Sequence, residues 1–190
     1  EQYLAGEEAS LIAACDGERH VLLPAARDYK RALAGDRGPN TGGMGAFAPT
    51  PAVTPEIERQ VSELVLTPVF RALAARGTPY RGALYAGLML TDSGPRVIEF
   101  NARFGDPETQ SVLPLVGGSL GTLLASAARG VLEPASIGRM AGAAVTLALV
   151  DAGYPDNVHG GGAIRGLEAL SARDAAASSG PGDAEALHVF

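Results

Sequence analysis

The sequence predicts an α+β fold in which antiparallel strands pack against helices. Two pairs of apolar runs separated by short turns, within residues 11–24 and 83–101, indicate antiparallel hairpins. Between them, apolar residues recur at helical spacing in residues 54–77. The 190 residues are 46% hydrophobic and 19% charged, which is ordinary for a folded globular protein and unlike a disordered one.

The first expected element is a hairpin. Residues 11–15 are typical of a short buried strand, Asp16-Gly17 of its turn, and residues 20–24 of the returning strand. The single cysteine, Cys15, falls in the first strand, where we expect a buried structural thiol. Residues 25–50 are polar and glycine-rich, and we expect a long loop there, which is usually functional or disordered.

Helix signals begin at Thr54. Its hydroxyl is expected to cap the helix, and Pro55 suits the first helical position. Pro68 is expected either to kink this helix or to begin a second one capped by Thr67. Gly77 is expected to end the stretch.

The remaining elements follow from the same signals. Residues 83–91 and 96–101 are expected to form two strands joined by a tight turn. Asp106 and Pro107 are expected to start a helix that runs to residue 117. Further expected elements are a helix capped by Ser119 and ending at 129–130, a strand at 143–150, a glycine-rich turn at 159–162, a loose surface loop at 171–183 and the start of a strand at 187–190.

The charge balance limits the possible partners. The formal net charge is −6 and the pI about 5.0, so we expect no nucleic-acid partner. The longest apolar stretch, residues 143–150, is far shorter than the roughly 20 residues needed to cross a bilayer, and the chain does not open like a signal peptide. We therefore expect a cytoplasmic protein without a membrane partner, of open oligomeric state. A Walker-type phosphate loop is absent from the sequence.

The sharpest chemical feature lies in the strand predicted at 96–101. Alternate residues of a strand point to the same side, which puts Glu99 and Asn101 together and Ile98 and Phe100 on the opposite, buried face. A carboxylate and an amide oxygen on one surface suit Mg²⁺, which takes one or two protein ligands besides water and phosphates. The alternative is a half-exposed strand whose polar residues face water. Arg103, Gly105 and Asp106 follow at once and favour a functional site.

These residues belong to a longer motif that is highly specific. It resembles the signature of the phosphoribosylamine-glycine ligase (glycinamide ribonucleotide synthetase) family. The family's other segments occur in the same order, and the resemblance weakens only after about residue 151. The segments are Glu99-Phe100-Asn101-Ala102-Arg103-Phe104-Gly105-Asp106-Pro107-Glu108-Thr109-Gln110, residues 28–31 with 38–45, residues 84–89 and residues 6–10.

The resemblance implies an ATP-grasp fold. Residues 1–130 would be the later part of the ATP-grasp domain, with the antiparallel sheet and helices of its C-terminal lobe. Residues 131–190 would start a small mixed β C-terminal domain. The family's N-terminal domain and its nucleotide-binding lysines would precede Glu1, leaving Lys30 as the only lysine, and the family's C-terminal end would follow Phe190.

The resemblance also implies an activity. Glycine would be joined to 5-phosphoribosylamine while ATP becomes ADP and phosphate, through glycyl phosphate, in purine biosynthesis. Glu99 and Asn101 would bind Mg²⁺ or Mn²⁺ at the ATP phosphates, and Arg103 would stabilise phosphoryl or acyl-phosphate oxygens. Asp106 would face the glycine substrate. Its alternative role is helix N-capping, and both roles stay open at this point.

The expected nucleotide contacts are less specific. The family's loop over the active site corresponds here to Gly42, Gly43 and Gly45, whose N–H groups would approach an anion closely, with Lys30 nearby. A flexible turn is the alternative. Either Glu1 or Glu7 would hold the ribose hydroxyls, and the alternative for both is a solvated acid.

One departure from the wider superfamily concerns the strand before the metal strand. Many ATP-grasp enzymes place a further acidic metal ligand there, but residues 83–90 contain no acid, so we expect water or another group to replace it. Two other interpretations stay open: another ATP-grasp carboxylate-amine ligase, or a noncatalytic nucleotide- or metal-binding domain. We expect residues 1–190 alone to be inactive as a ligase.

Overall fold

The computed structural model describes residues 2–170. The chain divides into two compact units, Glu1–Leu149 and Val150–Phe190, each of which is described by itself. The boundary expected at residue 130 falls inside the first unit. There β10 (Ile137–Arg139) pairs with β9 (Val116–Gly118), and β11 (Ala144–Leu147) pairs with β6 (Gly45–Ala48). Which domain each part represents stays a prediction.

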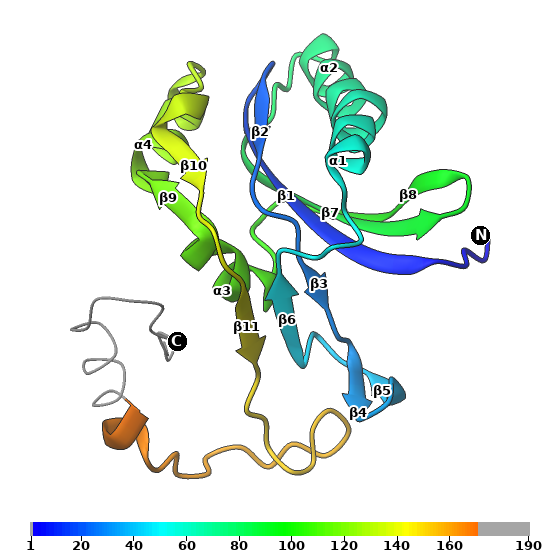
Figure 1. Ribbon diagram of the computed structural model, residues 1–190, viewed down its shortest axis with the longest axis vertical. Helices are drawn as coiled ribbons and strands as arrows, with labels where there is room; N and C mark the ends of the chain where they lie inside the picture. The colour runs from blue at the N-terminus through cyan, green and yellow to red at the C-terminus, as the bar shows by residue number, and fades with distance from the viewer. Residues whose placement is uncertain (1, 171–190) are drawn as a thin grey trace. The chain divides into compact units, whose positions relative to one another are not determined.

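A four-stranded antiparallel sheet forms the centre of the first unit (Figure 1). Its order is β2 (His20–Leu22), β1 (Glu7–Asp16), β7 (Arg81–Thr91) and β8 (Gly94–Asn101). Both expected hairpins are confirmed, since β1 pairs with β2 and β7 with β8. The strands β1 and β7 are longer than expected because they pair with each other along almost their full length.

Each face of this sheet carries its own apolar core. On one face, side chains such as Leu11 and Leu88 pack against Phe70 and its helical neighbours. On the other, Ile12 and Tyr85 pack against residues of α3 (Glu108–Val112) and α4 (Leu120–Arg129), such as Leu123. Figure 1 shows α2 and α4 on opposite sides of β1 and β2. The cores on both faces explain why most of β1 is buried.

The helical stretch between β6 and β7 begins and ends where the sequence predicts. The Thr54 hydroxyl accepts a hydrogen bond from the Ile57 N–H at the start of α1 (Pro55–Val61), and Gly77 follows α2 (Thr67–Ala75) with a positive φ. Pro68 neither breaks this stretch nor follows a capping Thr67. A π-helical turn, Ser62–Leu66, precedes it, and the Thr67 N–H bonds to the Ser62 carbonyl. The wider turn accommodates the proline ring inside a continuous helix.

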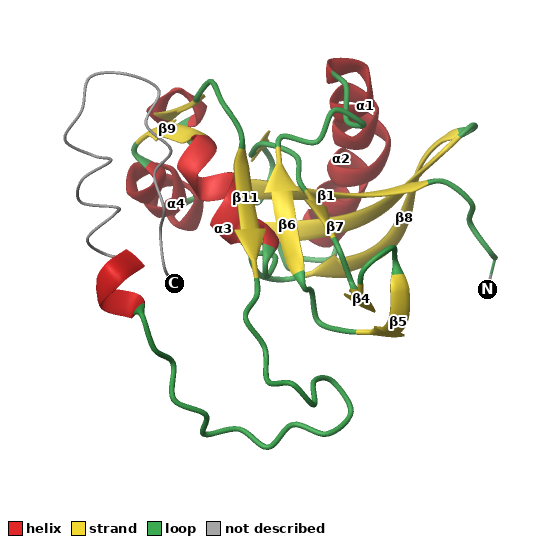
Figure 2. Cartoon of the chain, turned by 60° about the horizontal axis from the view of Figure 1, so that its bottom comes forward, coloured by secondary structure: helices red, strands yellow, loops and turns green. Residues whose placement is uncertain are grey.

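The long loop expected at residues 25–50 is wrong. The segment forms the short strands β3 (Arg27–Asp28), β4 (Arg31–Leu33) and β5 (Arg37–Asn40), and then β6. β3 and β11 flank β6 in a three-stranded sheet, and β4 pairs with β5 as a separate ribbon (Figure 2). Strands of two to four residues are too short to show an alternating pattern in sequence.

The helix expected from residue 106 to 117 is shorter. α3 ends at Val112 and gives way to a 3₁₀ turn, Leu113–Leu115, because Pro114 cannot continue an α-helix. The expectation that Asp106 caps this helix is also wrong, because α3 starts after Pro107 without a side-chain cap. The next helix is as expected, since the Ser119 hydroxyl accepts from the Thr122 N–H and Gly130 ends α4 in the left-handed conformation.

The second unit is described only over residues 150–170. A turn closes at its start, where the Tyr154 and Asn157 N–H groups bond to the Asp151 and Gly153 carbonyls. Residues 159–162 have no regular structure, residues 167–170 are helical, and the described part of this unit contains no strand. The expected loop at 171–183 and strand at 187–190 lie outside the described residues. No helix within residues 2–170 is long and apolar enough to cross a membrane.

Candidate metal and phosphate site

Six of the residues that the sequence predicts for the site line one small pocket of about 50 Å³ in the first unit. They come from three places: the end of β8 and the turn after it, the β3–β4 connection, and the glycine loop before β6. The pocket is lined by Asp28, Lys30, Gly42, Tyr85, Glu99, Asn101, Arg103, Gly105, Asp106 and Glu108.

The pairing of β7 with β8 sets the direction of the expected metal ligands. Glu99 lies opposite Gly87 and Asn101 opposite Tyr85, and directly opposed residues of an antiparallel pair share a face. A Cβ on Gly87 would lie 3.2 Å from the Glu99 Cγ, so this glycine leaves space for the Glu99 side chain. Glu99 and Asn101 therefore share the pocket face of the sheet, as predicted.

The burial expected for the opposite face of β8 is wrong. Ile98 and Phe100 are 45% and 39% exposed. β8 is an edge strand, and its register shifts between Gly87 and Leu88 so that Ile98 has no opposing residue. In the described residues, the helices on that face bury the central strands more completely than this edge.

Lys30 is held at the pocket by two carboxylates. Its Nζ lies 3.2 Å from Glu8 Oε2 and 3.8 Å from Asp28 Oδ2. Burial acts to lower the pKa of Lys30, but the charges of Asp28 and Glu8 outweigh it and raise that pKa, so the ammonium stays charged. Burial also raises the pKa of Asp28 to about 6; Lys30 opposes this rise, whereas Glu108 adds to it.

Arg103 and Asp106 lie in the turn that follows β8, and both are exposed. The Arg103 Nη1 donates a 2.7 Å hydrogen bond to the Phe104 carbonyl. The Asp106 Oδ1 accepts a 2.9 Å hydrogen bond from Gln110 Nε2 instead of capping the helix backbone. Their guanidinium and carboxylate groups thus remain accessible at the pocket rim.

The glycine loop at 41–45 is a packed turn. Thr41 Oγ1 accepts from the Gly43 N–H and donates to the Lys30 carbonyl, and the Met44 N–H bonds to the Tyr29 carbonyl. The donors of Gly43 and Met44 are therefore already used, and the loop is hydrogen-bonded and not the flexible turn given as the alternative. Of the three glycines expected at an anion, only Gly42 lines the pocket.

The other two glycines allow close approaches of the backbone. A Cβ on Gly43 would lie 2.3 Å from Pro107 Cδ, which presses this loop against the turn after β8. A Cβ on Gly45 would lie 2.4 Å from the Thr146 carbonyl oxygen, in the pairing of β6 with β11. Both glycines therefore have a packing reason in this structure.

Of the acids expected at the ribose, Glu7 does not line this pocket. Glu7 begins β1 and forms an ion pair with Arg27. Glu1 lies outside the described residues. Their proposed contact with a nucleotide stays a prediction.

Three ionisable residues of the pocket were given no role from the sequence: Asp28, Tyr85 and Glu108. Each lies in a segment that resembles the family, but no local pattern distinguished it as a site residue. Glu108 is 2% exposed, and its Oε1 accepts a 2.8 Å hydrogen bond from Ser10 Oγ, which lies 3.0 Å from the Tyr85 hydroxyl. Burial and then the Glu108 charge raise the pKa of Tyr85 far above its ordinary value.

The donor set fits a hard divalent cation. The pocket gathers four carboxylates, Asp28, Glu99, Asp106 and Glu108, against two cationic side chains, Lys30 and Arg103. No three His, Cys, Asp or Glu side chains within residues 2–170 are grouped closely enough to hold a metal by themselves. Mg²⁺ is usually held by one or two protein ligands, with water and phosphate completing the shell, and Glu99 with Asn101 meets that need.

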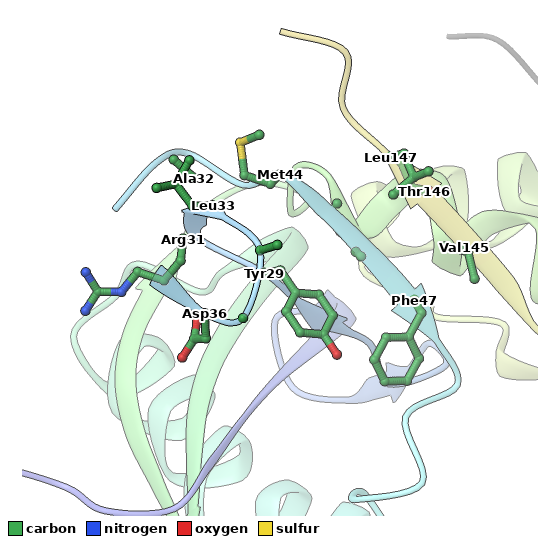
Figure 3. Close-up of a pocket in the computed structure, with 14 residues that line it drawn as sticks. Tyr29, Arg31, Ala32, Leu33, Asp36, Met44, Phe47, Val145, Thr146 and Leu147 are labelled. Atoms are coloured by element: carbon green, nitrogen blue, oxygen red, sulfur yellow. The ribbon is translucent and has the colours of Figure 1, made fainter. Parts of the chain in front are cut away.

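A larger cavity of about 560 Å³ lies elsewhere in the first unit (Figure 3). Its walls are mostly apolar and come from β4, β6 and β11, with Tyr29 and Phe47 ring centroids 6.2 Å apart. Figure 3 shows the Arg31 guanidinium directed away from these rings. We assign the chemistry to the smaller pocket because its ionisable and oxygen-donor groups converge, whereas the walls of this cavity offer few polar groups.

Comparison with known proteins gives consistent matches. A family model described as phosphoribosylglycinamide synthetase, ATP-grasp (A) domain, matches residues 1–109. The phosphoribosylamine–glycine ligase of Leptospira interrogans serovar Lai is 49% identical over 157 residues, which are 82% of this chain and 37% of that protein. The Streptomyces coelicolor ligase is 48% identical over 176 residues, 92% of this chain and 42% of that protein. The chain thus spans about two fifths of the length of these relatives.

Solved structures agree on the fold. Phosphoribosylamine–glycine ligase from Thermotoga maritima is 39% identical, with a TM-score of 0.69 over 82% of this chain and 39% of that one. Phosphoribosylglycinamide synthetase from Anaerococcus prevotii is 18% identical, with a TM-score of 0.55 over 79% of this chain and 36% of that one, and shares the fold. The expected ATP-grasp architecture is confirmed.

Proposed function

Because the chain belongs to the phosphoribosylglycinamide synthetase family through its ATP-grasp domain, we propose that it forms part of the active site of an ATP-dependent ligase. The reaction is the joining of glycine to 5-phosphoribosylamine, which gives glycinamide ribonucleotide, ADP and phosphate. The reaction uses Mg²⁺ or Mn²⁺ and takes place in the cytoplasm.

One observation carries this proposal. A single pocket gathers the oxygen donors Glu99 and Asn101, the cations Lys30 and Arg103, and the carboxylate of Asp106. Ligation of a carboxylate to an amine by ATP needs groups of all three kinds. Oxygen donors hold the metal, cations neutralise phosphate oxygens, and an acid pairs with an ammonium group.

The chemistry explains why phosphate groups matter at this site. A carboxylate is a poor electrophile until it is phosphorylated, and phosphoryl transfer depends on alignment and on neutralising the oxygens. When bound, the metal would neutralise and orient the ATP phosphates. The residues Glu99 and Asn101 would hold it on the pocket face of β8.

The remaining side chains act on the substrates. The Arg103 guanidinium would donate to oxygens of the transferred phosphoryl group and of glycyl phosphate. The Lys30 ammonium, kept charged by Glu8 and Asp28, would contact the phosphates. Asp106 would hold the glycine ammonium and so orient its carboxylate toward the phosphoryl group.

A chimera tests the function. The aligned part of this chain would replace the matching 157-residue stretch of the Leptospira interrogans ligase. ADP and glycinamide ribonucleotide would be measured with ATP, Mg²⁺, glycine and fresh phosphoribosylamine. We expect turnover within about tenfold of the parent, and Glu99→Gln in the chimera to lower it about a hundredfold or more, which is about 2.7 kcal/mol.

The matched control is Glu18→Gln, which removes an exposed acid at the β1–β2 turn. It should leave turnover within about twofold, as expected for a surface change away from the site. A folded chimera that makes no product, or one in which Glu99→Gln retains near-normal turnover at ordinary Mg²⁺ levels, would contradict the proposal.

A further inference from the structure

Glu108 is unusual for an acid in the first turn of a helix. Such an acid improves the helix from an exposed position, because its effect on the helix dipole needs no burial. Glu108 is nevertheless only 2% exposed, and buried glutamates are rare unless they are paired. Helix formation alone therefore does not account for its position.

The partners of Glu108 are hydroxyl groups from the central sheet. Its Oε1 accepts from Ser10 Oγ at 2.8 Å, and Ser10 Oγ lies 3.0 Å from the Tyr85 hydroxyl. Ser10 on β1 and Tyr85 on β7 are themselves 2% and 4% exposed. Lys30, the ammonium of the pocket, pairs with Glu8 and Asp28 instead. The carboxylate thus joins the start of α3 to two strands remote in sequence.

Two glycines allow the turn between β8 and α3 to pack closely against its neighbours. A Cβ on Gly105 would lie 2.7 Å from Glu108 Oε2 and 3.0 Å from Tyr85 Cδ2. On the other side, a Cβ on Gly43 would lie 2.3 Å from Pro107 Cδ. The turn is therefore enclosed between the buried hydroxyls and the 41–45 loop.

Arg103 and Asp106 depend on this turn for their placement. In the described part of the chain, the hydrogen bonds of both side chains reach only residues within four positions, Phe104 and Gln110. Glu99 and Asn101 are placed differently, by strand pairing with Gly87 and Tyr85. The two halves of the pocket therefore have separate supports.

We propose that Glu108 is a positioning residue that anchors the turn carrying Arg103 and Asp106 to the central sheet through Ser10 and Tyr85. This inference rests on the proposed function for the meaning of that placement. The anchor itself is a property of the fold. Loss of the anchor releases Arg103 and Asp106, and leaves Glu99 and Asn101 in place on β8.

The test uses the 190-residue chain with Glu108→Ala, Glu108→Gln and Ser10→Ala. Amide hydrogen exchange of residues 102–106 measures the anchor. Titration with Mn²⁺ alone measures the metal pair Glu99 and Asn101, and titration with Mn²⁺–ATP also measures the phosphate contacts of Arg103. The matched control is Ser126→Ala, which removes another fully buried hydroxyl, one that bonds within the α4 region.

We expect Glu108→Ala and Ser10→Ala to speed exchange in residues 102–106 by about tenfold, and to leave exchange in β7 within about twofold. In Ser10→Ala, which keeps every pocket carboxylate, Mn²⁺–ATP affinity should fall about tenfold, while affinity for Mn²⁺ alone changes less than about twofold. Glu108→Gln keeps the acceptor for Ser10 and should restore both properties to within about threefold. Ser126→Ala should leave both unchanged.

Unchanged exchange in residues 102–106, or an equal loss of Mn²⁺ and Mn²⁺–ATP affinity in Ser10→Ala, would overturn the proposal. Should Glu108→Ala not fold, the Ser10→Ala and Glu108→Gln variants decide the question in the same way. A wild-type chain that binds neither Mn²⁺ nor Mn²⁺–ATP would contradict the proposed function, while the exchange rates would still decide on the anchor.

Discussion

Single glycines determine how closely the segments around the pocket approach one another. Gly105 faces the Glu108 carboxylate and the Tyr85 ring, both of which are buried and leave no room for a methyl group. Gly121, in the first turn of α4, is the opposite case, because a Cβ there would meet nothing within 4 Å. Alanine substitutions at these two positions therefore compare a crowded glycine with an uncrowded one.

We predict that Gly105→Ala lowers the free energy of unfolding by about 1–3 kcal/mol, because the added methyl group must displace packed neighbours. Gly121→Ala should raise it by about 0.5–1 kcal/mol, since alanine is the better helix residue. Urea unfolding of both variants measures the difference. Equal effects of the two substitutions would show that the close contacts at Gly105 are not limiting.

Asp16 joins the end of β1 to a distant segment. Its carboxylate accepts from the Glu18 and Arg19 N–H groups, from the Arg19 side chain and, 116 positions away, from the Leu132 N–H at 2.8 Å. Burial acts to raise the pKa of Asp16, but these hydrogen bonds outweigh it and hold that pKa well below its ordinary value.

A lowered pKa makes a prediction about pH. The stabilisation by ionised Asp16 is present above the unfolded-state pKa of about 3.9 and is lost as the pH falls toward the folded-state value. Asp16→Asn should cost about 1–3 kcal/mol at pH 7, and this cost should shrink below about pH 4. Urea unfolding at pH 7 and pH 3 measures it, with the exposed Asp92→Asn as control. A cost that stays constant with pH would rule out this ionisation.

At the scale of elements, two helix starts with similar sequences differ in structure. Ser119 and Asp106 both precede helical segments, and both residue types are favoured caps. Only Ser119 caps its helix, since its hydroxyl accepts from the Thr122 N–H, whereas α3 begins two residues after Asp106 and the Asp106 carboxylate accepts from the Gln110 side chain. Asp106 is thereby free to serve the pocket.

This difference predicts that two alanine substitutions affect stability unequally. Ser119→Ala should lose about 1 kcal/mol and lower the melting temperature by about 2–4 °C, because a helix N–H loses its acceptor. Asp106→Ala should change the unfolding free energy by less than about 0.5 kcal/mol. Thermal melts of both variants measure this. A drop for Asp106→Ala as large as that for Ser119→Ala would restore its capping role.

The elements that the sequence predicts are those with local signals. The β7–β8 hairpin, the Thr54 cap and the Ser119 cap each follow from a few adjacent residues. Of the strands between residues 27 and 48, β6 pairs with the distant β11, which no local pattern reveals, and β3, β4 and β5 are too short to show an alternating pattern. The exposed side chain of Phe100 has the same origin, since a pattern shows the face of a strand but not whether the strand lies at an edge.

The site follows the same division. Glu99, Asn101, Arg103 and Asp106 are adjacent in sequence, so strand alternation and one motif were enough to group them. Asp28 and Tyr85 reach the pocket from separate segments through folding, whereas Glu108 lies two residues after Asp106 in the same motif. The nucleotide contacts expected at Gly43 and Gly45 are those for which the structure supplies a packing explanation.

For the whole molecule, the size of the pocket limits what the chain does alone. About 50 Å³ accommodates a metal ion with little else, and Lys30 and Arg103 are the cations that line it. We predict that residues 1–190 bind Mn²⁺–ATP weakly and form no product with glycine and phosphoribosylamine, because affinity requires an enclosing, pre-organised site. Coupled detection of ADP and amide measures this. Sustained turnover would show that the chain closes a complete site.

The account depends on a divalent metal binding between Glu99 and Asn101. The most direct measurement is paramagnetic broadening by Mn²⁺ of the amide resonances of the ¹⁵N-labelled chain. We predict that substoichiometric Mn²⁺ broadens residues 28–30, 85–87 and 99–106 first, and that Glu99→Gln abolishes this selective broadening whereas Glu18→Gln preserves it. Broadening that starts elsewhere in the chain, or that is the same in Glu99→Gln and the wild type, would contradict the account.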